Sequence, residues 1–127
     1  MQRLTSLALM LCASAVQATP RLHCALTYAG STQMLEVVPV ADPYRVASVD
    51  VGGRFRFKAV MVGRDQRVDY IKLYAYLDTA RQPVLVQQIT YQPPFATGNS
   101  LTGKQFIYAG PVERELQYEC TFNEVNP

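Results

Sequence analysis

The chain has almost no histidine and no tryptophan. Its one imidazole is His23, which is therefore the only candidate base for a Ser-His-Asp or Cys-His arrangement. No Gly-x-Ser-x-Gly motif supplies an activated serine, and the thiol of Cys24 is expected to be engaged in a disulfide. As a metal ligand His23 lacks partners, and Met34 and Met61, which could bind copper, fit better as core residues. The sequence therefore predicts a protein without catalytic activity, metal or other cofactor.

Two further catalytic patterns are weak. Gly52-Gly53 joins two expected strands and no helix follows, so it does not fit a phosphate-binding loop. Glu113, Glu115 and Glu119 fall on one face of the last expected strand, and glycoside hydrolases use paired carboxylates. The composition offers no aromatic cleft around them, so we favour a solvated strand face.

A strong excess of one charge is also absent. Beyond residue 18 there are eleven Lys and Arg residues and ten Asp and Glu residues. This balance gives no field that would attract nucleic acid, and no nucleic-acid partner is expected. Residues 54–81 carry seven cations and three anions, whereas the last fifteen residues carry four glutamates and one arginine. Two opposed patches fit this pattern, but solvated strand faces explain it more simply.

A long apolar run occurs at the N-terminus. Arg3 precedes an almost wholly apolar segment from Leu4 to Val16, and Ala18 provides the small residue expected at a cleavage site. The run is shorter than the roughly twenty residues of a membrane helix. Residues 1–18 are therefore predicted to be a signal peptide, followed by a single domain over 19–127 without a membrane span, in the periplasm or outside the cell. Cys12 follows bulky Leu11 within the run, so no lipid anchor is expected.

Two cysteines remain beyond the predicted signal peptide, Cys24 and Cys120, near opposite ends of the domain. An exported protein meets an oxidising compartment, so a disulfide between them is the default expectation. The loop that it closes spans almost the whole domain. The chain-entropy model assigns such a loop roughly 4 to 5 kcal/mol of stability.

Short strands with period-2 alternation fill the rest of the chain, and no helical period longer than a turn is found. They are expected at 22–28, 34–40, 44–51, 55–62, 69–77, 84–91, 104–110 and 112–122. Pro39 indicates an edge or bulge in the second strand, and a shift of the apolar phase predicts a bulge at Gln87-Gln88. The pattern predicts an all-β fold, a small antiparallel β-sandwich or partly open barrel of about seven to eight strands.

The hairpin around Gly52-Gly53 determines which faces are buried. A two-residue turn would set Val51 and Val49 opposite arginines. A three-residue turn instead pairs Val51 with Phe55, Val49 with Phe57 and Ala47 with Ala59, and sets Asp50 opposite Arg56 on the other face. This register places apolar residues opposite apolar residues on one face and opposite charges together on the other, so it is preferred.

The same register directs the tyrosines of the next strand outward. Ile71, Leu73 and Leu77 should then pack on the core. The outer face should carry six large polar or charged residues, namely Arg56, Lys58, Tyr70, Lys72, Tyr74 and Tyr76. These rings either cover the stems of neighbouring cations or form a surface that contacts a partner, since Tyr and Arg are favoured in interface centres.

Residues 93–103 form a loop that is long for a hairpin connection. Phe95 and Leu101 could pack on the sandwich edge and make it an ordered flap, and Phe95, Asn99 and Leu101 are the candidate binding residues of the loop. The expected function is binding or support of another envelope protein, or self-association, through the outer face. The alternative is a carbohydrate or small-ligand binding protein that uses the same face or this loop, and an enzyme is the third possibility.

Overall fold

A computed structural model describes residues 10, 12, 19–97, 99–110 and 114–125 of the chain. The predicted signal peptide lies outside the described residues except for Met10 and Cys12, and Glu113 also lies outside them. Within the described residues, no helix is long and apolar enough to cross a membrane.

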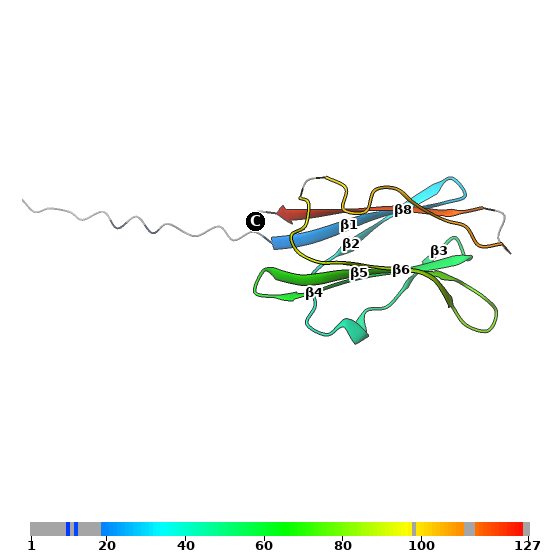
Figure 1. The fold of residues 1–127 in the computed structure, drawn as a ribbon, viewed down its shortest axis with the longest axis horizontal. Coiled ribbons are helices and arrows are strands. Elements are labelled where there is room, and N and C mark those ends of the chain that lie inside the picture. The colour runs from blue at the N-terminus through cyan, green and yellow to red at the C-terminus, as the bar shows by residue number, and fades with distance from the viewer. Residues whose placement is uncertain (1–9, 11, 13–18, 98, 111–113, 126–127) are drawn as a thin grey trace, which may run out of the picture.

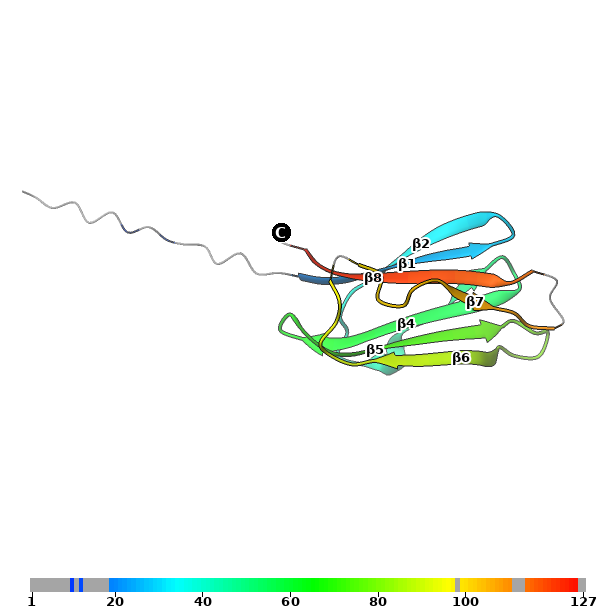
Figure 2. The same ribbon diagram turned by 45° about the horizontal axis from the view of Figure 1, so that its top comes forward.

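In the described part of the chain, eight strands form two antiparallel sheets that pack face to face (Figures 1 and 2). The strands are β1 (Thr19–Tyr28), β2 (Ser31–Val37), β3 (Val49–Val51), β4 (Phe55–Arg64), β5 (Arg67–Leu77), β6 (Val84–Tyr91), β7 (Gln105–Ile107) and β8 (Leu116–Val125). The first sheet has the order β2-β1-β8-β7 and the second has the order β3-β4-β5-β6. The predicted all-β sandwich is confirmed, and the sheets do not close into a barrel.

Alternating side chains build the core between the two sheets, because successive residues of a strand point to opposite faces. The second sheet contributes Phe55, Phe57, Ala59, Met61, Ile71, Leu73 and Ala75. The first sheet contributes Leu22, Cys24, Leu26, Leu116, Tyr118, Cys120 and Phe122. The rings of Phe57 and Tyr118 meet across the layers at 4.8 Å between centroids. The outward direction predicted for the tyrosines is therefore confirmed.

The predicted disulfide joins Cys24 and Cys120, which lie opposite each other on the adjacent central strands β1 and β8. Both cysteines are fully buried on the inner face. The covalent link therefore lies in the core and joins β1 and β8, the first and last of the described strands, within one sheet.

The preferred hairpin register is confirmed for Val51 with Phe55, Val49 with Phe57 and Asp50 with Arg56. The predicted pairing of Ala47 with Ala59 is wrong, because β3 begins only at Val49. The chain before it forms a 3-10 turn, η1 (Pro43–Arg45), which is capped by the Asp42 side chain. The Asp-Pro pair favours such a turn over the long strand predicted from residue 44.

The segment after β2 crosses from one sheet to the other. β2 ends at Val37 rather than residue 40, and Val40 forms a parallel bridge with Val62 of β4. Pro39 lies in this crossing segment, outside the strand ladder, where its lack of a backbone N–H leaves no ladder hydrogen bond unmade. Next to the bridge Gly63 donates its N–H to Val40 O at 3.0 Å, and a Cβ there would lie 2.1 Å from Arg67 O. Only glycine fits this close backbone approach.

The bulge predicted in β6 is present one residue earlier than Gln87-Gln88. Gln87 pairs with Ala75 and Leu85 pairs with Tyr76, so Val86 is the extra residue. This insertion reverses the face that side chains present before and after it, which explains the shift of the apolar phase.

Candidate functional site

The six residues predicted to form the outer face lie together on adjacent strands of the second sheet. Arg56 is opposite Tyr76, Lys58 is opposite Tyr74, and Tyr70 and Lys72 continue the same row along β5. Each of the six side chains is half-buried. We call this set, Arg56, Lys58, Tyr70, Lys72, Tyr74 and Tyr76, the tyrosine face.

Aromatic and cationic side chains of the tyrosine face are arranged against one another. The Tyr74 and Tyr76 rings are stacked, with centroids 6.2 Å apart and planes at 11°. The Lys58 ammonium lies 4.5 Å from the Tyr74 centroid and 5.9 Å from that of Tyr76. The Lys72 ammonium lies 5.5 Å from the Tyr70 centroid. Such contacts each contribute roughly 0.5–1 kcal/mol at exposed sites and restrict the rotamers of both partners.

Arg56 is held by the chain just before β3. Its Nε donates to Ser48 Oγ at 2.8 Å and a terminal nitrogen donates to Ser48 O at 3.0 Å. Asp50 is opposite Arg56 in register, but its carboxylate accepts from the Gly53 N–H at 3.2 Å. The guanidinium is thus fixed in place by neutral acceptors and keeps its charge available to a partner.

The η1 turn forms one border of the tyrosine face. Pro43 and Tyr44 line a depression of about 260 Å³ together with residues of β4 and β5, namely Lys58, Val60, Tyr70, Lys72 and Tyr74. Val60 is only 2% exposed although it points outward, because the surrounding side chains and η1 cover it. Tyr44 is 95% exposed. Sequence reasoning missed Tyr44 since it placed this residue in a strand, and the Asp42-Pro43 pair was the available signal.

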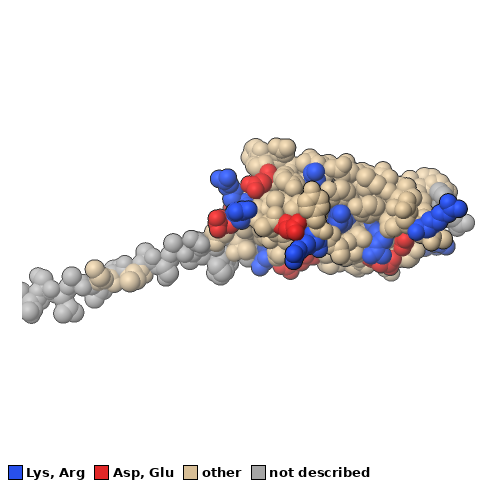
Figure 3. Space-filling view, turned by 90° about the horizontal axis from the view of Figure 1, so that it is seen from below, with Lys and Arg blue, Asp and Glu red and all other residues tan. Residues whose placement is uncertain are grey.

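Charge on this side of the molecule is mixed but locally positive. Figure 3 views the sandwich from the η1 side and shows Lys and Arg side chains spread along it, with acidic side chains between them. The tyrosine face itself contains three cations, and Asp50 lies opposite one of them, Arg56, on the same side of the sheet. The arrangement can bind an acidic or hydrogen-bonding surface through cations and ring edges.

The loop after β6 is pinned to the first sheet, as predicted for an ordered flap. The Phe95 ring packs on Phe122 with centroids 5.2 Å apart. The Leu101 N–H donates to Cys120 O at 2.8 Å, and Thr102 Oγ1 accepts from the Cys120 N–H at 3.0 Å. Asn99 is exposed. The loop covers the edge of β8, and a binding role for it stays a prediction.

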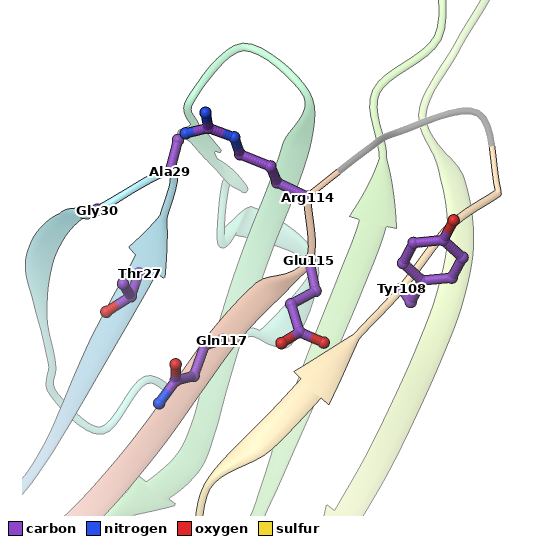
Figure 4. A pocket seen from close by; sticks show the side chains of 7 residues that line it. All are labelled: Thr27, Ala29, Gly30, Tyr108, Arg114, Glu115 and Gln117. Carbon is purple, nitrogen blue, oxygen red and sulfur yellow. The ribbon is translucent and has the colours of Figure 1, made fainter.

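A separate hollow lies at one end of the first sheet (Figure 4). Glu115 points into it between Gln117 and Tyr108, and Arg114 extends toward the turn between β1 and β2. The two described glutamates of the candidate carboxylate set, Glu115 and Glu119, are four residues apart along the chain, roughly 13 Å if extended. That separation exceeds the roughly 5–9.5 Å of paired catalytic carboxylates.

His23 lies half-buried on the outer side of β1, opposite Glu36 on β2 and Thr121 on β8. Among the residues that the structure describes, no three His, Cys, Asp or Glu side chains come together to hold a metal ion.

Met61 is buried as predicted, but the core assignment of Met34 is wrong. Met34 is 66% exposed because it points outward from the edge strand β2.

Comparison with protein-family models, with curated proteins and with solved structures found no match to this chain. The geometry of the molecule is therefore the basis for any functional conclusion.

Proposed function

We propose that the protein is an exported binding module without catalytic activity, and that its tyrosine face binds another protein of the cell envelope. The observation that carries this proposal is the stacked pair of Tyr74 and Tyr76 under the Lys58 ammonium. Side chains already held in one arrangement lose less conformational entropy when a partner binds. Tyr and Arg are also the residue types that contribute most strongly at interface centres.

The partner is expected to present an acidic surface. Arg56, Lys58 and Lys72 lie on the tyrosine face with Asp50 opposite Arg56, so the group carries a net positive charge, and a complementary negative patch would accelerate association and set orientation. Export is supported by the Cys24–Cys120 disulfide, which fits an oxidising compartment.

A small-ligand function is the second candidate. The depression beside η1 brings Tyr44, Tyr70 and Tyr74 near two ammonium groups. Aromatic rings around a hollow suit a sugar, and the cations favour one that carries an acidic group.

The test compares envelope capture by the parent protein with capture by the Tyr74→Ser/Tyr76→Ser variant. Under the proposal the variant folds normally and loses the captured protein, and the parent's capture weakens with added salt. Tyr108→Ser is the matched control, because Tyr108 is 67% exposed and lies off the tyrosine face. Equal capture by the parent and the folded double variant would contradict the proposal. Unchanged protein capture with loss of binding to an acidic glycan would favour the second candidate.

A further inference from the structure

The edge strand β6 differs from the other edges of the sandwich. It is the last strand of the second sheet and is eight residues long. In the described part of the chain, its backbone pairs with β5, and no further strand lies beside its free edge (Figure 2). Its unpaired N–H and C=O groups are a template for another strand.

Charge that would protect this edge is missing. No Lys, Arg, Asp or Glu occurs between Arg81 and Lys104. The side chains of Val84, Leu85 and Val86 are 45%, 49% and 40% exposed. Natural proteins usually protect an edge with charged residues, short strands, prolines or bulges, and β6 has one bulge, at Val86.

The remaining edges are protected. β3 and β7 are three residues each, and β3 carries Asp50. β2 is longer but carries Glu36, whose carboxylate is 3.3 Å from Arg21 Nε. The difference singles out β6, and in particular the segment after the bulge, Gln87 to Tyr91, which stays in continuous register with β5.

We propose that β6 pairs antiparallel with β6 of a second copy of this chain across a twofold axis. A second copy fits because β6 is itself an uncharged, extended strand, so two copies meet without opposing like charges. Ile89 and Tyr91 are half-buried on the inner side of the edge, and a paired strand would complete their burial. The second sheet of one copy and the second sheet of the other then form one continuous eight-stranded sheet across the twofold axis.

An axis perpendicular to the sheet places both tyrosine faces on the same side of the dimer. If the proposed function holds, the dimer would present two binding faces to one partner assembly and gain avidity. This consequence rests on the proposed function, whereas the pairing of β6 does not. Because paired strands alone bury less than the roughly 1,200 Å² of a stable interface, self-association should be weak and concentration-dependent.

The test is sedimentation of the protein purified after expression of the full chain, up to about 1 mM, the range in which weak association is measured. We expect the mass to rise from monomer to dimer with concentration. The middle of the segment from Gln87 to Tyr91 is Ile89, so antiparallel pairing about this residue sets Gln88 of one copy opposite Thr90 of the other. The two Gln88 side chains then lie diagonally on the same face of the joined sheet, within reach of long side chains. Gln88→Lys and Gln88→Glu each bring two like charges together there, so each variant alone should remain monomeric. An equimolar mixture should form a mixed dimer, because the two charges are then opposite in sign.

Met34→Lys is the control, since it adds a charge to the exposed edge strand β2 and should leave the dimer intact. Thermal unfolding near the parent's midpoint establishes that the variants are folded. A parent that stays monomeric, a species larger than a dimer, or dimers of both single Gln88 variants would overturn the proposal. Envelope capture is measured separately, so loss of one result leaves the other interpretable.

Discussion

The outer faces of the two sheets differ far more than their inner faces. Both inner faces carry alternating apolar residues that fill one core. The outer face of β1 and β8 carries mainly small or polar side chains, with a contact of 2.8 Å between the hydroxyls of Thr27 and Thr32 on β1 and β2. The outer face of β4 and β5 carries stacked tyrosines and cations. Folding requires only that an outer face tolerate water, so the contrast raises the question whether the tyrosine face serves the fold or a partner.

The largest loss of stability is expected in the first sheet, whose outer face lacks the stacked tyrosines, because this sheet contains the disulfide. Cys24→Ala/Cys120→Ala removes a link between residues 96 apart and should lower the free energy of unfolding by roughly 4 to 5 kcal/mol. Urea unfolding measures this change. Met34→Ala, at a position of β2 in the same sheet that is 66% exposed, is the control and should change the free energy of unfolding by less than about 0.5 kcal/mol. A loss below about 1 kcal/mol would show that the link is dispensable.

Truncation of a core ring in the second sheet comes next. Phe57 is fully buried and contacts Tyr118 in the opposite layer. Phe57→Ala should cost about 3–5 kcal/mol, since it removes buried area and leaves a cavity. Chemical denaturation with a parallel Phe106→Ala control, at a position 55% exposed, measures the difference between an inner and an outer ring.

The same measurement on the tyrosine face should give a smaller loss. Tyr74→Ser/Tyr76→Ser removes one stacked pair and two cation contacts but creates no core cavity. We expect a cost of at most roughly 1 to 2 kcal/mol for the double variant. If this double variant loses as much stability as Phe57→Ala, the face serves the fold, and the contrast between the two outer faces has no functional meaning.

The smallest effect concerns a polar link inside the sandwich. The Tyr118 hydroxyl donates to Gln87 Oε1, and Gln87 Nε2 donates to Gln105 Oε1 at 3.3 Å, which joins β8, β6 and β7. Tyr118→Phe should cost about 0.5–1.5 kcal/mol near pH 7, because Gln87 keeps its second contact. Thermal unfolding of both proteins checks this value.

The pH dependence of that variant gives an independent readout. Burial, with a further contribution from Tyr91, raises the pKa of the Tyr118 hydroxyl above its ordinary value. The unfolded chain therefore loses this proton first, and stability should fall as pH rises above about 10. In Tyr118→Phe this part of the alkaline loss should disappear. An identical alkaline loss in both proteins would contradict the burial of the hydroxyl.

Local patterning predicted much of the fold. Strict alternation on β1, β4 and β5 identified the buried faces, and the clash of Val49 and Val51 with arginines selected the hairpin register, which the structure confirms. The disulfide was predicted from the two cysteines that remain beyond the predicted signal peptide, and the structure contains it. The bulge in β6 was predicted within one residue from the shift in apolar phase.

Other features needed the tertiary structure. Tyr44 belongs to η1 beside the tyrosine face, but a short turn has no periodicity to detect. Met34 has the same apolar character as a core residue, and only its pairing with Ala25 on an edge strand places it outside.

The sequence by itself determined the all-β class, the inner faces, the disulfide and the membership of the tyrosine face. These depend on a period of two along the strand and on the residues of one hairpin. The tertiary structure decided how the strands divide between two sheets and which strand ends each sheet. It thereby decided that the uncharged strand β6 has a free edge and that η1 borders the tyrosine face. Which strands and turns lie next to each other depends on pairing between segments far apart in the sequence, and the local alternation of residues carries no signal of that pairing.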